Sequence, residues 1–232
     1  YGVNQISLVG DAFAKPINRY LEELAHRDSS APSLDSVVRI TSSGATLSGD
    51  QKLGLRRFMP NATMIDMLGA SEGGPFGIDL TPPDKEPLET AVFIAPPNVV
   101  AFDDETWEAI PRGSGRVGVL GVAGAIPAGY YKDSAKTAST FREVNGVRYS
   151  VPGDRARWSE DGLLELHGRD SVTINSGGEK IFAEEVEEAV KAHPAVADCL
   201  VVGLPDDRFG QVVTAVVTLH AGATTTPAEI EI

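Results

Sequence analysis

The chain has 232 residues, of which 42% are hydrophobic, so it is long enough to bury one large core or two ordinary ones. Lys and Arg number 20 against 33 Asp and Glu, and the net charge of -13 leaves no basic surface for a nucleic-acid backbone. An anion of the size of ATP stays compatible with this charge, because a few donors, a helix N-terminus or a magnesium ion are enough to hold it.

Cysteine and histidine usage argues against a disulfide framework and a zinc site. Cys199 is the one cysteine, and it predicts a buried thiol in a reducing compartment. The four histidines are scattered without paired spacing. No cationic region followed by an apolar run opens the sequence, and no window reaches membrane-spanning length. We therefore expect a cytoplasmic chain without a transmembrane segment; peripheral membrane contact and the oligomeric state stay open.

Strand and helix signals alternate over the first seventy residues. We predict strands at 5–9, 37–40 and 63–68, with helices at 11–26 and 49–58 between them. Asp11 is expected to cap the first helix, whose apolar stripe includes Tyr20, and Ser48 and Gln51 form a capping box before the second. This order implies parallel strands with right-handed crossovers, so the turn at 41–45 and the loop at 69–74 fall at carboxyl strand ends, where ligands bind in such sheets.

The pattern changes twice further along the chain. Past residue 83, short strands at 91–94, 99–103, 116–122 and 163–167 alternate with Pro and Gly turns, which indicates a small antiparallel sheet or barrel that seats Asp154. Beyond Arg169, a strand at 172–174, a helix at 183–192 and strands at 199–204 and 212–219 indicate a smaller α+β unit. Ala189 is expected on the inner face of this helix and Glu187 on the outer one. A helix signal at 227–230 predicts that the chain stops inside this unit.

Three polar turns lie between residues 149 and 187. They are Pro152-Gly153-Asp154, Gly168-Arg169-Asp170 and Gly177-Gly178-Glu179-Lys180. Each follows or precedes a short apolar strand. Turns of this composition, gathered within about forty residues, predict a site for a small, polar, partly anionic ligand.

Seven motifs occur in a fixed order along nearly the whole chain. They are VGDAFAKP at 9–16, SSGA at 42–45, LGASEGG at 68–74, GYYKD at 129–133, PGDRARW at 152–158, GRDSVTINSGGEKI at 168–181 and PDDRFGQ at 205–211. This ordered set resembles the adenylate-forming superfamily of acyl-CoA synthetases, luciferases and peptide-synthetase adenylation domains. The likeness is greatest to the actinobacterial fatty-acyl-CoA ligases.

The resemblance implies a fold and a reaction. Residues 1–168 would form the latter part of a large AMP-binding domain, with an α/β sheet at 1–90 and a β-barrel-like part at 91–168. A hinge at 169–171 and a truncated small C-terminal domain at 172–232 would follow. The implied reaction joins a fatty or steroid side-chain acid to CoA, using ATP and Mg²⁺, through an acyl-adenylate. An acyl-AMP ligase that serves a carrier protein, and a noncatalytic nucleotide-binding module, stay open as alternatives.

The resemblance also implies roles for residues of the large domain. Glu72 matches the magnesium-binding glutamate, Ser71 keeps a hydroxyl for phosphate, and Gly69 lets the phosphates approach. Leu68 stands where an aromatic residue often covers the adenine. The loop at Ser43, Gly44 and Ala45 would lie against the base. An acyl pocket would include Met67, Leu68 and residues 73–76.

Ribose and CoA contacts are implied nearer the domain junction. Asp154 matches the aspartate that accepts hydrogen bonds from both ribose hydroxyls. Arg169 would contact the ribose as well, with a plain ion pair to Asp170 or Glu165 as the alternative. The hinge falls on Asp170 or Ser171. Gly178 would border the pantetheine tunnel, and Lys180 would lie near the phosphate.

Two parts of the family's machinery are not in the sequence. These are the phosphate loop, expected before Tyr1, and the adenylation lysine, expected after Ile232. Lys15 and Lys180 are not expected to replace that lysine. By itself, this polypeptide is therefore expected to lack appreciable acyl-CoA synthetase activity.

Overall fold

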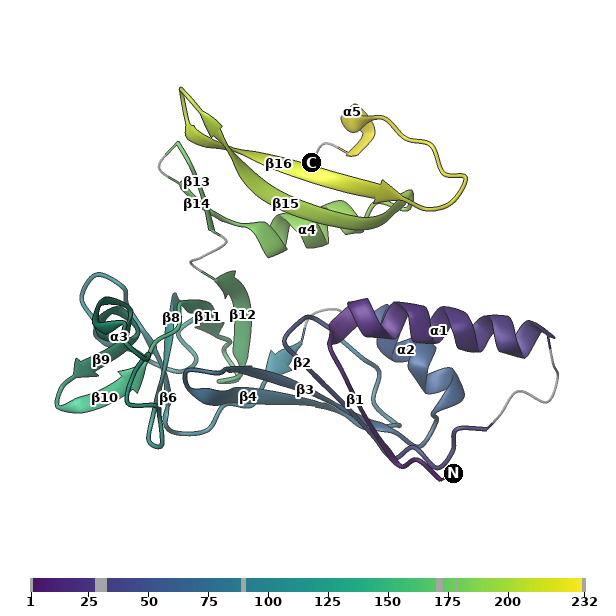
Figure 1. Ribbon diagram of the computed structural model, residues 1–232, viewed down its shortest axis with the longest axis horizontal. Coiled ribbons are helices and arrows are strands. Elements are labelled where there is room, and N and C mark those ends of the chain that lie inside the picture. The colour runs from purple at the N-terminus through teal and green to yellow at the C-terminus, as the bar shows by residue number, and fades with distance from the viewer. Residues whose placement is uncertain (1, 28–32, 89–90, 170–172, 178, 231–232) are drawn as a thin grey trace.

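Three β-sheets follow one another along the chain in the computed structural model, which describes residues 2–27, 33–88, 91–169, 173–177 and 179–230 (Figure 1). Of residue 180 it describes the backbone alone. The first two sheets lie side by side in the lower half of Figure 1, and the third lies above them. None of the helices within the described residues is long and apolar enough to span a membrane.

The first sheet has the order β1-β2-β3-β4. β1 (Gln5–Leu8), β2 (Arg39–Ser43) and β3 (Thr63–Ala70) pair in parallel, as predicted, and α1 (Gly10–Arg27) and α2 (Gly49–Phe58) connect them. β4 (Gly74–Thr81) returns antiparallel to β3, so the glycine-rich loop is a hairpin turn. The sequence pattern did not predict β4, because two glycines and a proline near its start interrupt the alternation of apolar and polar residues. Of the β1 residues only Leu8 is buried, although a short apolar run such as 5–9 is typical of a buried strand.

Contacts between α1 and α2 replace the local caps expected for both helices. The Asp11 carboxylate accepts hydrogen bonds from the Ser48 backbone N–H at 2.8 Å and from its hydroxyl at 3.0 Å. The Asn18 amide donates to Gln51 Oε1 at 2.9 Å. The predicted capping box is therefore wrong, because its two side chains bond across the helix pair. Tyr20 is 64% exposed, whereas Asn18 takes a buried place on α1.

A buried lysine is enclosed between α2 and the β3–β4 hairpin. Lys52 Nζ lies 2.5 Å from Asp66 Oδ2 and 3.6 Å from Asp79 Oδ2, and its side chain is 0% exposed. Asp66 and Asp79 are directly opposed on the two strands. Burial raises the pKa of Asp66, although the nearby Lys52 ammonium opposes that change. Two carboxyl groups thus share one cation in the interior.

Asp66→Asn is expected to flatten the pH dependence of stability. A carboxyl group whose pKa is raised on folding stabilises the folded state below its unfolded pKa, and this contribution is lost as the pH rises through the folded pKa. The unchanged chain should lose that contribution as the pH rises from about 4, and the variant should not. Urea unfolding across this pH range measures the difference, with the exposed Asp84→Asn as the matched control. Parallel curves for Asp66→Asn and the unchanged chain would contradict the expectation.

The second sheet is antiparallel, as predicted. Its main path runs β5-β12-β11-β8-β10-β9, with β6 paired to β7 and β8. Buried Trp158, Leu164 and Leu120 form its core together with Phe76 from β4. The strands are β5 (Val92–Phe93), β6 (Val99–Phe102), β7 (Ala109–Ile110), β8 (Val117–Ala123), β9 (Phe141–Val144), β10 (Val147–Ser150), β11 (Asp154–Trp158) and β12 (Leu164–Arg169).

Five elements of this region were not predicted, namely β7, β9, β10, β11 and a short helix. β11 was missed because Pro152 and Gly153 precede a charged stretch, so that Asp154 was assigned to a turn; it begins the strand instead. The short helix α3 (Ser134–Thr140) was missed because its sequence, SAKTAST, has no apolar face. Asp133 caps α3 by accepting a hydrogen bond from the Lys136 N–H.

The third sheet has the order β14-β13-β16-β15 and packs on α4. Its core includes Val190, Val196 and Cys199, so the predicted burial of the thiol is confirmed. Ala189 is exposed and Glu187 is half-buried, which corrects the predicted helix faces; Glu187 Oε1 accepts a hydrogen bond from the Val201 N–H at 2.8 Å. The elements are β13 (Thr173–Ser176), β14 (Glu179–Phe182), α4 (Ala183–Lys191), β15 (Val196–Asp206), β16 (Gly210–Leu219) and α5 (Pro227–Ile230).

Candidate active site

The predicted ribose-site residues meet across two neighbouring strands. Asp154 at the start of β11 is the register partner of Arg169 at the end of β12. Arg169 Nε donates to Asp154 Oδ1 at 2.5 Å and Nη2 to Oδ2 at 3.3 Å, a bidentate pair. The alternative pairing of Arg169 with Glu165 does not occur, because Glu165 pairs with Arg157 at 2.5 Å.

The Asp154–Arg169 pair has one buried and one accessible end. The Asp154 side chain is 3% exposed, whereas that of Arg169 is 46% exposed. Burial raises the pKa of Asp154, although Arg169 opposes this change. Each carboxylate oxygen has two lone pairs, so the guanidinium leaves acceptor capacity on both oxygens. The Asp154 carboxylate therefore keeps acceptor capacity while the ion pair stays intact.

Glu72 lies in the turn between β3 and β4 and is held by a residue from another part of the chain. The Tyr130 hydroxyl donates to Glu72 Oε1 at 2.7 Å. This bond, with smaller contributions from Lys136 and Arg169, lowers the pKa of Glu72. Tyr130 was quoted within the GYYKD motif but was given no role, because nothing in the sequence connects residues 58 positions apart.

The two loops at the carboxyl ends of β2 and β3 lie on one edge of the first sheet. Ser43 is the register partner of Met67, just before the Glu72 loop. Ser43, Gly44 and Ala45 are exposed, and Gly44 has a φ of +83°, which favours glycine. The predicted turn at 41–45 begins later than expected, because residues 41–43 belong to β2. Ser71 is exposed on the neighbouring loop.

Leu68 does not present a side chain to this edge. It is 8% exposed and packs in the core of the second sheet with Phe76, which is 0% exposed. Both had been assigned to ligand-facing positions, and the structure corrects this, whereas Met67 is 40% exposed. At Gly69 a Cβ would lie 2.7 Å from the Gly74 carbonyl oxygen, so the hairpin itself requires glycine there.

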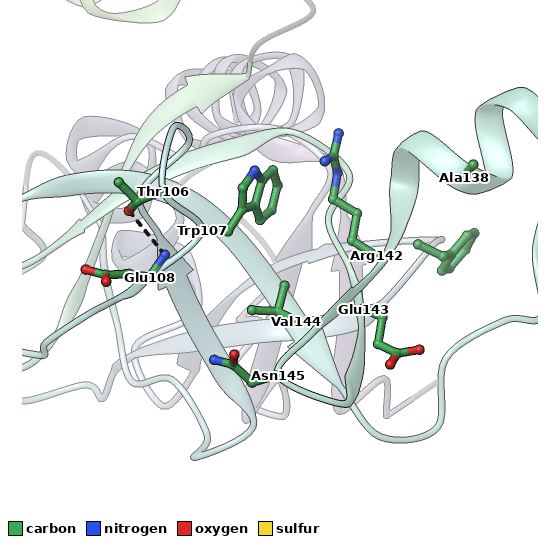
Figure 2. Close-up of a pocket in the computed structure, with 9 residues that line it drawn as sticks. Thr106, Trp107, Glu108, Ala138, Arg142, Glu143, Val144 and Asn145 are labelled. Atoms are coloured by element: carbon green, nitrogen blue, oxygen red, sulfur yellow. Dashed lines mark hydrogen bonds between the residues drawn. The ribbon is translucent and has the colours of Figure 1, made fainter.

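A separate surface hollow of about 790 Å³ lies between the 106–108 loop, α3 and β9 (Figure 2). The Arg142 guanidinium lies 4.3 Å from the centre of the Trp107 ring at its rim. The lining residues, taken from the described part of the chain, include none of the predicted site residues. We therefore place the candidate site at the strand ends rather than here.

Comparisons with known proteins agree on one family. The AMP-binding enzyme C-terminal domain model matches residues 185–231. The 3-oxocholest-4-en-26-oate–CoA ligase of Rhodococcus rhodochrous is 44% identical over 228 residues, and the medium-chain acyl-CoA ligase Mig of Mycobacterium avium is 42% identical over 225. The crystal structure of ATP-bound MatB from Rhodopseudomonas palustris is 26% identical with a TM-score of 0.74, over 98% of this chain and 43% of that one. The chain is therefore similar to AMP-binding acyl-CoA ligases along nearly its whole length.

Coverage differs greatly between the two sides of these comparisons. The Rhodococcus ligase matches 98% of this chain, but the chain spans 41% of that ligase. The corresponding values for the Mycobacterium ligase are 97% and 40%. The matched length includes the Glu72 hairpin, the Asp154–Arg169 pair and the α4 region.

The third sheet contacts β12 through α4. His167 Nδ1 lies 2.6 Å from Glu185 Oε1, and a Cβ at Gly168 would lie 2.6 Å from Glu184 Oε2. Gly168 also has a φ of +126°, and this backbone conformation favours glycine beside Arg169. Burial raises the pKa of Glu184. Glu184 and Glu185 are both exposed on α4, and both lie beside β12.

Several predicted positions at the domain junction lie outside the described residues. These are the two hinge candidates, Asp170 and Ser171, together with Gly178. Lys180 takes part in β14 through its backbone, as the register partner of Asn175, and its side chain is not described. The roles suggested for these residues therefore stay predictions.

The chemistry of the site fits a magnesium ion that is shared with a ligand. Within the described residues, no group of three or more His, Cys, Asp or Glu side chains could hold a metal ion. Glu72 offers a carboxylate oxygen, and Mg²⁺ is commonly held by one or two carboxylates together with water and substrate phosphates. A metal that arrives with a nucleotide is compatible with this donor set.

Proposed function

We propose that the whole protein is an ATP-dependent acyl-CoA ligase. It would convert a carboxylic acid and ATP to an acyl-adenylate and pyrophosphate, and then transfer the acyl group to the thiol of CoA. The main support is the 44% identity to a CoA ligase over 228 residues, across the segments that bring Glu72, Asp154 and Arg169 to one region. Because the chain spans 41% of that relative, the complete reaction is a proposal for the whole protein.

A hydrophobic carboxylic acid is the proposed acyl substrate. The two relatives named above are a steroid side-chain acid ligase and a medium-chain acyl ligase, and both names describe apolar acids. Exposed Met67 beside the Glu72 loop is compatible with an apolar acyl group at this edge. The identity of the acid is tested by pyrophosphate release across acids of increasing chain length and ring content.

We assign nucleotide binding to the strand-end residues. Asp154 would accept hydrogen bonds from the ribose hydroxyls with the capacity that Arg169 leaves on its carboxylate. The exposed backbone at Ser43, Gly44 and Ala45 would lie against the adenine. A buried carboxylate held by a bidentate arginine is already oriented, so little conformational entropy is lost when the ribose binds.

Glu72 and Ser71 are assigned to the triphosphate. Glu72 would hold Mg²⁺, which supplies charge neutralisation for the phosphates when it is bound. The Ser71 hydroxyl is exposed on the same loop and would donate to a phosphate oxygen. The Tyr130 hydrogen bond keeps Glu72 ionised, because it favours the charged form of the carboxyl group. CoA contacts at Gly178 and phosphate contacts at Lys180 stay predictions.

Glu72→Gln in the whole protein is expected to lower pyrophosphate release roughly 100-fold, a typical loss when one electrostatic stabiliser of the transition state is removed. Glutamine keeps the size of the side chain and loses the anionic oxygen. The measurement is acid-dependent pyrophosphate release at several magnesium concentrations. Glu160→Gln, on the exposed turn before β12, is the matched control. Equal rates for Glu72→Gln and the unchanged protein would contradict the role of Glu72.

Two results from the unchanged protein would contradict the ligase proposal. If the unchanged protein releases no pyrophosphate with any carboxylic acid, the proposal is wrong. If pyrophosphate is released but acyl transfer requires a carrier protein instead of CoA, the acyl-AMP ligase alternative replaces it. Each outcome is read from the unchanged protein, before any variant is examined.

A further inference from the structure

Tyr130 connects the Glu72 hairpin to the segment between β8 and α3. Its hydroxyl donates to Glu72 Oε1 at 2.7 Å, across 58 residues of sequence. The tyrosine is half-buried, whereas the next residue, Tyr131, is 88% exposed. Two adjacent tyrosines of one motif therefore have different surroundings, and only the first contacts the site.

The Tyr130 side chain is held in place from several directions. Its backbone N–H donates to Thr137 Oγ1 at 2.9 Å, and the Thr137 hydroxyl donates to the Asp133 carbonyl at 2.6 Å. Lys136 Nζ lies 4.3 Å from the centre of the ring, and the Phe141 ring packs with a centroid separation of 5.9 Å. These contacts anchor the phenol to α3 and the start of β9, so its position does not depend on the hairpin.

Glu72 itself has few restraints of this kind. It lies in a tight turn in which the Gly73 N–H donates to the Ala70 carbonyl, and it is followed by two glycines. A carboxylate on such a turn samples several rotamers unless a partner selects one. The Tyr130 hydrogen bond occupies Oε1 and leaves Oε2 for another interaction.

We propose that Tyr130 is a positioning residue for magnesium binding: by holding one oxygen of Glu72, it directs the other toward a cation that arrives with ATP. This inference rests on the proposed function, because it takes Glu72 as the magnesium ligand. It adds a residue that acts through Glu72 and does not touch the nucleotide. The magnesium affinity of the nucleotide complex is therefore the property that Tyr130 sets.

Tyr130→Phe in the whole protein is the direct test. The ring stays, with its contacts to Lys136 and Phe141, and the hydroxyl is removed. The magnesium concentration for half-maximal binding of α,β-methylene-ATP, which cannot be cleaved at the α-phosphate, should rise roughly tenfold, as expected when a hydrogen bond to a charged group is lost. Isothermal titration at a series of MgCl₂ concentrations measures this directly. Pyrophosphate release with ATP should recover toward the unchanged rate at saturating magnesium.

Matched variants separate positioning from a merely structural role. Tyr131→Phe removes a hydroxyl from the neighbouring exposed ring and should leave the magnesium dependence unchanged. In a Glu72→Gln background, Tyr130→Phe should have little further effect on it, because the two residues act as one unit. Thermal unfolding of each variant checks that the fold is retained. If Tyr130→Phe does not fold, Thr137→Val, which releases the Tyr130 backbone, should raise the half-maximal magnesium concentration by a smaller factor.

Three outcomes would overturn the inference while leaving the ligase proposal standing. The first is an unchanged magnesium dependence in Tyr130→Phe with a lowered unfolding temperature. This result would mean that the contact only stabilises the packing of the two sheets. The second is tighter magnesium binding, which would mean that the phenol competes with the cation. The third is an unchanged magnesium dependence in a folded Thr137→Val when Tyr130→Phe does not fold. Absence of pyrophosphate release from the unchanged protein would instead count against the ligase proposal itself.

Discussion

Lys52→Met is expected to destabilise the chain by about 3–5 kcal/mol, the usual cost of removing one partner from a buried ion pair. Lys52 is the cation between Asp66 and Asp79, at 2.5 and 3.6 Å, and its side chain is 0% exposed. Methionine fills a similar volume, so the loss comes mainly from charge. Without the ammonium, two carboxyl groups face each other across β3 and β4 in a site from which water is excluded, and at least one must take up a proton.

Denaturant unfolding of this chain measures the effect of Lys52→Met. Lys191→Met, at the exposed end of α4, is the matched control and should leave the midpoint nearly unchanged. Adding Asp66→Asn to Lys52→Met should restore part of the stability, because one carboxyl group then replaces two. A midpoint for Lys52→Met that equals that of the unchanged chain would show that the cluster is solvated, contrary to its burial.

Asp154→Ala in the whole protein is expected to weaken ATP binding by roughly 10- to 100-fold, which corresponds to the loss of two hydrogen bonds to a charged acceptor. The fold should be retained, because the Arg169 side chain is 46% exposed and can be solvated when its partner is removed. Asp154→Asn should have a smaller effect, since the amide keeps one acceptor oxygen. The measurement is equilibrium binding of ATP, with thermal unfolding in parallel.

Asp161→Ala provides the control for Asp154→Ala. Asp161 lies in the exposed turn that connects β11 to β12, so it belongs to the same hairpin without reaching the site. An unchanged ATP affinity in Asp154→Ala would count against ribose recognition by this residue. An affinity lost together with the folded state would show instead that the Asp154–Arg169 pair is required for the sheet.

Local patterns predicted the regular parts of the fold. α2 has the predicted bounds, and β1, β2 and β3 pair in parallel as the alternation of strands and helices implied. β4 and β11 were missed because glycine, proline and charge at their beginnings are typical of turns. The bonds from Ser48 to Asp11 and from Asn18 to Gln51 could not be predicted, because each joins residues more than thirty positions apart in sequence.

The site was predictable as a set of residues but not as an arrangement. Family resemblance selected Glu72, Asp154 and Arg169, and the register of β11 and β12 then explains why two of them pair. Tyr130 carried no local signal beyond its presence in a motif. Leu68 was predicted to face the ligand because it lies beside the Glu72 loop. The alternation of side chains along β3 places it in the core instead. Lys52 was overlooked because lysine on a helix is ordinarily exposed.

The β3–β4 hairpin belongs to two hydrophobic cores at once. Met64 near its open end packs in the core beneath α1 and α2, whereas Leu68 and Phe76 near its turn pack in the core of the second sheet. The backbone of the Glu72 turn is therefore positioned by two separately packed cores, and its side chain is positioned by Tyr130. A small shift of one sheet relative to the other would displace the Glu72 carboxylate even while both cores remained packed. The accuracy of the proposed metal contact therefore depends on how the two sheets pack together, and not only on the loop itself.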